Sequence, residues 1–250
     1  MFVRPTNPIS HRLARMAFIS ACVAALIVAA AGPLHRYLGL DIEAAIAVFR
    51  YGFYVAVAGV ALGLATIVPT RPGDRRRGFV AAFLAVVIGA AGAWVPVSWF
   101  LWSQQLPVIN DITTDIANPP AMVALLQLRR GAPNPPPYPG AAAAALQREA
   151  YPDIVTMVLP AAPAEAFKRA DRVAMAMGWD VVARAPAEGR IEAVDTSGWF
   201  GFRDDIVVRI RAEGTGSRID VRSKSRAGES DLGVNARRIR DFSARLKAEH

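Results

Sequence analysis

The sequence predicts an α+β protein in which three N-terminal transmembrane helices precede a small antiparallel sheet of about five strands, with two helices packed on one face of the sheet. Three long apolar runs in the first hundred residues predict the transmembrane helices. The last hundred residues give the order strand, helix, four strands, helix, which is typical of such a sheet. We therefore divide the chain into a membrane domain (1–102), a linker and Pro/Ala-rich connector (103–150) and an α+β extracytoplasmic domain (151–250).

The third apolar run is the clearest of the three spans. Residues 79–101 carry no formal charge and, at 1.5 Å per residue, are long enough to cross a bilayer core of about 30 Å. The second run, 51–68, contains a Gly59-xxx-Gly63 step that favours close helix packing. The first run, 16–31, is short, so an uncleaved anchor and a cleaved signal peptide both remain open.

The distribution of arginines predicts how the spans are oriented. Seven arginines flank the spans on the side of the N-terminus, and two lie on the opposite side. The seven are Arg4, Arg12, Arg15, Arg71, Arg75, Arg76 and Arg77, and the two are Arg36 and Arg50. No Lys or Arg follows the third run until Arg129. Because basic residues favour the cytoplasmic side, we expect a cytoplasmic N-terminus and an exported C-terminal domain, with Trp94, Trp99 and Trp102 in the far aromatic belt.

The formal charge of +8 does not indicate a nucleic-acid-binding protein, because most of it flanks the apolar runs. Residues 1–102 carry a net charge of +6 and residues 103–250 only +2. Basic residues beside a span act as a topology signal and contact anionic lipid. The single cysteine, Cys22, excludes an intrachain disulfide. Residues 19–22 are similar to a lipobox, but the apolar run continues past them, which favours a buried thiol over a lipidated one.

Start and stop signals place the elements of the exported domain. Pro163 at a first helical position and Gly178 after the last turn bound one helix, and Asp231 caps the other. Gly214-Thr215-Gly216 joins two strands as a hairpin. The predicted strands are 153–159, 179–184, 190–196, 204–213 and 217–225.

The two hairpin strands alternate cleanly between apolar and charged residues. One face carries Ile206, Val208, Ile210, Ile219 and Val221, and the other carries Asp205, Arg209, Arg211, Asp220, Arg222 and Lys224. Because successive strand residues point to opposite faces, the apolar set is expected to lie under the helices. We expect the charged set to face water, either as an ordinary solvated face or as a surface for an acidic ligand or lipid headgroups.

Several stretches of the exported half carry a resemblance to a known family. They are Arg190-Ile191-Glu192-Ala193, Trp199–Ile210, Asp220–Arg226 and Gly228–Ile239, together with the opening Asp111-Ile112-Thr113-Thr114-Asp115. From Ile109 to Leu246 the chain resembles domain-of-unknown-function family 1499, which occurs in bacteria and chloroplasts, and only some members have the three spans. The family carries no established activity. With the orientation above, the resemblance implies a multi-pass protein of the bacterial inner membrane with a periplasmic C-terminal domain.

The most polar group of residues lies where the last strand passes into the last helix. Its members are Arg222, Ser225, Arg226, Ser230, Asp231 and Asn235. A helix N-terminus offers free N–H groups and positive potential, and two arginines add to it, so a small anion could bind. The structural alternative is that Asp231 or Ser230 caps those N–H groups and that acidic neighbours pair with the arginines.

Other chemical sites have weaker support. Asp204 and Asp205 could form an acid/base pair, but adjacent strand residues face opposite sides of a sheet. Asp111 and Asp115 are read as turn formers rather than Ca²⁺ ligands. The three histidines, His11, His35 and His250, all lie outside the compact domain, which also lacks cysteine. We therefore expect neither a metal site nor a cofactor there.

The aromatic stretch between two predicted strands is a candidate contact surface. Trp199, Phe200 and Phe202 either rest in a membrane interface, meet a partner, or fold back into the core.

Two functions remain after these exclusions. The first is a noncatalytic periplasmic module that binds a partner protein of the envelope, lipid or a small anion, suggested by the absence of a nucleophile–base arrangement. The alternative is a membrane-tethered enzyme that uses Asp204 or Asp231 with Arg222 and Arg226.

Overall fold

The structure is a computed structural model that describes residues 8–70 and 77–249. It divides into two compact units. The first contains the residues up to Gln104 together with Trp199–Gly201, and the second contains Gln105–Gly198 and Phe202–His250. Each unit has its own buried apolar cluster.

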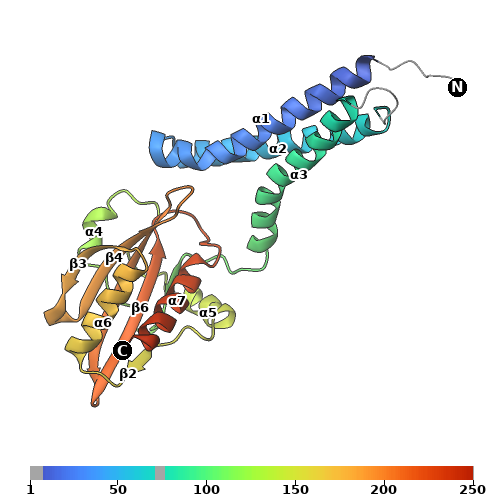
Figure 1. The fold of residues 1–250 in the computed structure, drawn as a ribbon. Coiled ribbons are helices and arrows are strands. Elements are labelled where there is room, and N and C mark those ends of the chain that lie inside the picture. Colours follow the sequence, from blue (N-terminus) through green and yellow to red (C-terminus); the bar gives the residue numbers. More distant parts are fainter. Residues whose placement is uncertain (1–7, 71–76, 250) are drawn as a thin grey trace. The chain divides into compact units, whose positions relative to one another are not determined.

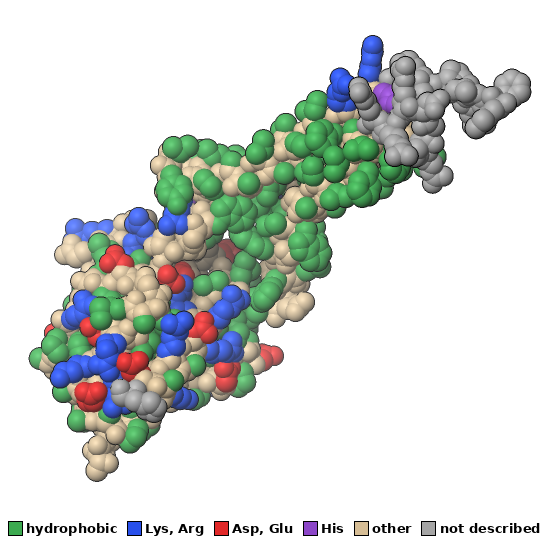
Figure 2. Space-filling model, in the orientation of Figure 1, with side chains coloured by type: hydrophobic (Ala, Val, Ile, Leu, Met, Phe, Trp, Pro, Cys, Tyr) green, Lys and Arg blue, Asp and Glu red, His purple; other side chains and the backbone are tan. Residues whose placement is uncertain are grey.

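The first unit consists of three long helices, as predicted. They are α1 (Pro8–Leu38), α2 (Ile42–Ile67) and α3 (Arg77–Ser103), and each is long and apolar enough to cross a membrane. Figure 2 shows hydrophobic side chains over their outer surface, which indicates a membrane protein. The short first run is therefore part of a longer helix. Arg4, Arg71, Arg75 and Arg76 lie outside the described residues, as does the side chain of Arg77.

Small residues let the three helices pack closely, as the glycine spacing predicts. A side chain at Gly59 would meet the backbone of Ala21 in α1, and one at Gly63 would meet the carbonyl of Ala82 in α3. The two glycines of one step thus face two different helices. Asp41 begins α2, because its carboxylate accepts the N–H of Glu43 at 2.9 Å.

The second unit contains a six-stranded antiparallel sheet with the order β1-β6-β5-β4-β3, and β2 also pairs with β6 (Figure 1). Its strands are β1 (Asp111–Thr113), β2 (Met157–Leu159), β3 (Asp180–Ala185), β4 (Arg190–Thr196), β5 (Arg203–Glu213) and β6 (Gly216–Ser225). Five of these were predicted, and β1 was not. The α+β class is confirmed.

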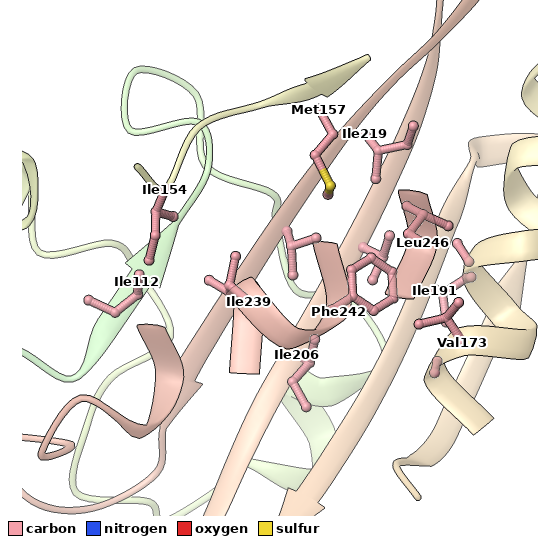
Figure 3. Packing of buried hydrophobic residues seen from close by; sticks show 14 of the residues in the cluster. Ile112, Ile154, Met157, Val173, Ile191, Ile206, Ile219, Ile239, Phe242 and Leu246 are labelled. Atoms are coloured by element: carbon pink, nitrogen blue, oxygen red, sulfur yellow. The ribbon is translucent and has the colours of Figure 1, made fainter. Parts of the chain in front are cut away.

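Two helices, α6 (Pro163–Ala176) and α7 (Val234–Ala248), pack on one face of the sheet, as predicted (Figure 1). The apolar residues of the β5–β6 hairpin meet them there, and we call this side the helix face. Figure 3 shows Ile206, Ile219 and Ile191 of the sheet around Ile239 and Phe242 of α7. The ring of Phe242 also stacks on Trp179 at 5.3 Å between centroids. These contacts form the main core.

The opposite face of the sheet is covered, so the expectation that its charged residues face water is wrong. Asp205, Asp220, Arg222 and Lys224 are all buried there, and only Arg211 is exposed. Residues 114–139, which we call the strap, run over this side, which we call the strap face. Charged side chains tolerate this burial because they pair with each other and with strap carbonyls.

The stretch 103–150, expected as a linker and connector, belongs to the packed structure. It supplies β1, the strap with its short helix α4 (Leu125–Leu128), and α5 (Ala141–Ala150). Met122 and Leu125 of the strap pack with Val194 and Val207 of the sheet in a second apolar cluster. Gln147 of α5 fixes β1, because its amide bonds both the N–H and the C=O of Thr113, at 3.0 and 2.6 Å. The amide thus covers the free edge of that strand.

Candidate functional site

The polar centre of the second unit is the strap face, where alternate residues of β4, β5 and β6 carry charge. The period of two along each strand collects these side chains on one side of the sheet. They group around four carboxylates from distant parts of the chain, Asp111, Asp205, Asp220 and Glu192. All four carboxylates are buried and each bonds at least one cation.

Asp111 lies between two cations of β6. Arg222 donates to both of its carboxylate oxygens at 2.9 and 2.7 Å, and Lys224 donates at 3.0 Å. Further donors of these cations bond strap carbonyls, those of Pro120 and Pro136 for Arg222 and that of Pro137 for Lys224. The two cations thus share one carboxylate, and the backbone of the strap supplies further acceptors.

Two ionisable groups beside Asp111 are shifted by this burial. Burial lowers the pKa of Lys224, although the negative charge of Asp111 opposes the shift. Burial raises the pKa of Tyr138 to about 12, and the charge of Asp111 adds to the shift. Within the described part of the chain, the buried hydroxyl of Tyr138 has no hydrogen-bond partner.

Asp205 is the centre of a second cluster. Arg226 donates to both of its oxygens, at 2.7 and 3.1 Å, and Arg129 of the strap donates to one of them. Arg129 also donates to the carbonyls of Asn134 and Ser225. The cluster therefore joins Arg129 and Asn134 of the strap to the end of β6.

Asp220 and Asp115 share two arginines in a third cluster. Arg209 donates to Asp220 at 2.8 Å and to Asp115 at 3.0 Å, and Arg218 donates to both as well. Burial acts to raise the pKa of Asp220, but hydrogen bonds from Thr156, Arg209 and Arg218 outweigh it and hold the pKa below its ordinary value. Asp115 also accepts the N–H of Asn118 at 2.9 Å, in keeping with its predicted role as a turn former. The same prediction is wrong for Asp111, which lies in β1 and bonds cations instead.

Glu192 of β4 holds the start of α4. Its buried carboxylate accepts the backbone N–H groups of Val123, Ala124 and Leu125 at 2.9–3.0 Å, and it also pairs with Arg190 at 2.8 Å. Free N–H groups at a helix start need such an acceptor. The carboxylate therefore fixes the conformation of this part of the strap.

A separate polar group lies on the helix face, where β6 passes into α7. Arg238 of α7 lies between Asp195 and Asp204, each 2.7 Å from its guanidinium. Asn235 accepts from Ser223 and donates to Ser225, at 2.6 and 3.0 Å. These bonds attach the first turn of α7 to the last residues of the sheet.

Asp231 bonds free N–H groups at the start of α7, as the structural alternative predicts, although the N-cap position itself is Gly233, two residues later. Its carboxylate accepts the N–H of Gly233 at 2.9 Å and that of Asn235 at 2.7 Å. Burial raises the pKa of Asp231, against the lowering effect of these two N–H groups. Ser230 lies beside it and donates to the carbonyl of Pro107 at 3.4 Å.

The structure places the residues of the predicted anion site on two sides of the sheet. Arg222 and Arg226 lie on the strap face and bond carboxylates there, whereas Ser225, Asp231 and Asn235 bond one another or α7 on the helix face. Asp204 and Asp205 likewise bond different arginines on opposite faces, as the strand alternation predicts.

The candidate aromatic contacts also divide. Trp199 and Phe200 belong to the first unit, where the centroids of both rings lie 5.5–6.0 Å from those of Phe49 and Trp99. Trp199 also donates to the carbonyl of Ala29 at 3.1 Å. Phe202 belongs to the second unit, and its N–H bonds the hydroxyl of Ser197.

The carboxylates of this arrangement hold buried cations and backbone N–H groups. Each of them accepts hydrogen bonds from a guanidinium, an ammonium or backbone N–H groups. Among residues 8–70 and 77–249, no three His, Cys, Asp or Glu side chains are grouped so as to hold a metal ion.

Sequence reasoning missed the strap and its partners. Glu192, Arg129 and Gln147 make contacts between residues 34–96 positions apart, which no local pattern indicates. One signal was present, because residues 116–148 contain no Asp or Glu at all.

Comparisons with known proteins agree with the resemblance found in the sequence. A family model described as "Protein of unknown function (DUF1499)" matches residues 111–246. The match begins with β1 and so includes the strap. No curated protein matches the chain.

Proposed function

The chain belongs to the DUF1499 family, which has no described function, and from this premise we propose that it is a multi-pass protein of the bacterial inner membrane that presents a noncatalytic interaction module to the periplasm. Three helices anchor the module, which binds a partner protein, lipid or a small anion.

The proposed location rests on the arginine asymmetry. Seven arginines flank the spans on one side and two on the other, and none lies within twenty residues after the third span. Short basic segments stay in the cytoplasm, so the second unit lies on the periplasmic side.

The proposed noncatalytic role rests on how the acidic residues are used. Asp204 is bonded by Arg238 and Asp231 by two backbone N–H groups, so both candidate catalytic carboxylates already have structural partners. The candidate arginines Arg222 and Arg226 each bond both oxygens of a buried carboxylate. This mutual pairing is the observation that carries the proposal.

A fusion experiment tests the location. Alkaline phosphatase joined after His250 is expected to be active, because the enzyme folds only outside the cytoplasm. A fusion between α1 and α2, after Leu40, is expected to be active as well, whereas a fusion in the turn after Pro69 is expected to be inactive. An inactive C-terminal fusion in a stably produced chain would contradict the periplasmic location.

Substitution of the candidate carboxylates tests the noncatalytic role. We expect Asp204→Asn and Asp231→Ala to lower the thermal stability of the full chain in detergent, since both remove structural bonds. A catalytic residue behaves differently, because its loss abolishes function while the melting temperature stays nearly unchanged. Complementation of a deletion strain at low temperature, where destabilised variants still fold, provides the functional readout.

A further inference from the structure

We propose that the apolar outer side of the strap, formed by Val123, Leu126 and Leu128 with Arg130 beside them, rests in the interface of an anionic bilayer. The inference rests on the proposed membrane anchorage and names lipid as the occupant of one surface of the module. We call these four residues the strap patch.

The apolar members of the strap patch point away from the protein. Val123, Leu126 and Leu128 are 49%, 44% and 50% exposed, whereas Leu125 between them is fully buried against the sheet. Three large aliphatic side chains therefore stand in solvent within six residues of one short segment. Such contiguous exposure is unfavourable in water and is typical of a contact surface.

The charge around the strap patch complements an anionic lipid surface. Residues 116–148 contain no Asp or Glu, although the whole chain has 21 acidic residues. Arg130 is exposed directly after α4, while its neighbour Arg129 is buried with Asp205. The two carboxylates that bond this segment, Glu192 and Asp205, are buried beneath it. Exposed aliphatic side chains next to an exposed arginine, in a stretch without Asp or Glu, are the combination found in interfacial membrane segments.

The strap patch belongs to the second unit, which a short connection joins to the third apolar helix. Seven residues, 104–110, connect the end of α3 with β1. Fully extended, seven residues span roughly 25 Å, which sets an upper limit on the distance between the end of α3 and β1. Ser225 lies at the same end of the sheet as Asn110 and Arg129, because its N–H bonds the carbonyl of Asn110 and its carbonyl accepts from Arg129.

The strap patch is held in its outward position by buried bonds. Glu192 fixes the start of α4 through three backbone N–H groups. Asp205 fixes Arg129, the residue that follows α4. Binding a bilayer therefore needs no rearrangement of the strap, which reduces the entropy lost on contact.

Site-specific lipid quenching of the full chain in nanodiscs tests the inference. In a Cys22→Ala background, Leu126→Cys carries an environment-sensitive fluorophore, and the discs contain lipid with a nitroxide near the headgroup. Val158→Cys is the matched control, because Val158 is an aliphatic residue 61% exposed on β2 and pairs with Arg218 at the opposite end of the sheet. We expect stronger quenching at position 126 than at position 158 in discs that contain phosphatidylglycerol.

Charge reversal tests the lipid specificity. Arg130→Glu is expected to lower the ratio of membrane-bound to water-exposed strap patch by about fivefold for each unit of charge changed. The lower ratio is measured as weaker quenching at position 126. Arg211→Glu makes the same change at an exposed residue of β5 near the hairpin end and is expected to have no effect.

Three results would overturn the inference. The first is equal quenching at positions 126 and 158. The second is quenching at position 126 that is as strong in purely zwitterionic discs as in discs that contain phosphatidylglycerol. The third is shielding of position 126 only when a second copy of the chain shares the disc. A failure of the anchorage itself is seen separately, as release of the whole chain by alkaline carbonate, and it contradicts the proposed function rather than the strap patch alone.

Discussion

At the scale of single residues, the second unit is organised by buried carboxylates that each accept several charged or backbone donors. Asp111 and Asp205 are bonded by two cations each, and Glu192 by three N–H groups and one arginine. Removing one partner of such a buried pair leaves an uncompensated charge. The stability of the domain is therefore expected to depend more on these residues than on its exposed ion pairs.

Asp231→Ala is expected to destabilise the second unit by about 0.5–2 kcal/mol, the usual cost of removing a helix cap. Asp231→Asn keeps an oxygen acceptor and is expected to lose less. Asp241→Ala, at an exposed position of α7, serves as the control and is expected to change stability by at most about 0.5 kcal/mol. Amide hydrogen exchange of α7 in the full chain measures all three. Equal exchange in Asp231→Ala and Asp241→Ala would contradict the cap.

Asp220 is expected to make the stability of the sheet fall in acid. Its pKa is held below the ordinary value of 3.8, so folding favours its charged form. Its contribution is complete above pH 3.8 and is lost as the pH falls through the lower folded value. Asp231 has the opposite sign, because its raised pKa means that protonation favours the folded state.

The measurement is the unfolding of the full chain in detergent between pH 7 and pH 3, compared between the native chain and Asp220→Asn. The variant is expected to be less stable at pH 7 and to show a shallower loss in acid. Parallel curves for the two chains would rule out Asp220 as the titrating group.

At the scale of elements, the strap is a segment with little regular structure that is fixed by side-chain bonds. Its four-residue helix α4 is too short to be stable alone. It is maintained by Glu192 at its start and by the contact of Leu125 with the sheet. The strap in turn lets the charged face of the sheet be buried, because its carbonyls accept from Arg222 and Lys224.

Glu192→Gln is expected to release the strap. The amide cannot accept three N–H groups and a guanidinium at once, so buried donors are left unsatisfied at a cost of about 1–3 kcal/mol. Trypsin cleavage after Arg130 in the folded chain is expected to accelerate. Glu188→Gln is the matched control, since Glu188 is exposed and pairs with the same Arg190. A similar cleavage rate in both variants would refute the role of Glu192.

Gly63→Val is expected to separate α2 from α3. A Cβ at Gly63 would already lie 3.0 Å from the carbonyl oxygen of Ala82, so a larger side chain overpacks the contact by about 1–3 kcal/mol. Leu64→Val, at an exposed neighbouring position, is the control. Titration of the full chain with sodium dodecyl sulfate measures the loss of helix packing, and identical midpoints for the two variants would contradict it.

At the scale of the whole molecule, the proposed orientation depends on a few arginines near the spans. Replacing Arg71, Arg75, Arg76 and Arg77 with Gln and introducing Lys at Gln104 and Gln105 reverses the charge difference across the third span. A mixed or inverted orientation is expected, with lower activity of the C-terminal phosphatase fusion. Lys at Glu213 and Thr215, more than one hundred residues from the spans, is expected to leave the activity unchanged.

The three long helices, the α+β class, five of the six strands and the cap at Asp231 follow from the sequence. Each depends on a local signal, such as an uncharged run, a period of two, or an acceptor before a helix. The alternation along β5 and β6 also correctly separated the apolar hairpin residues of the main core from the charged residues that pair with each other, although it did not show that the charged face is covered.

Only the tertiary structure decided what covers the charged face and which residues satisfy it. The alternation of apolar and charged residues along a strand shows that the two faces of the sheet differ. A charged face is stable either in water or beneath groups that pair with its charges. The sequence of the strand does not distinguish these two situations. The compensating groups here, Arg129 and the carbonyls of Pro136 and Pro137, come from a stretch that has the composition of a linker. Long-range pairing, rather than local propensity, makes that stretch part of the fold.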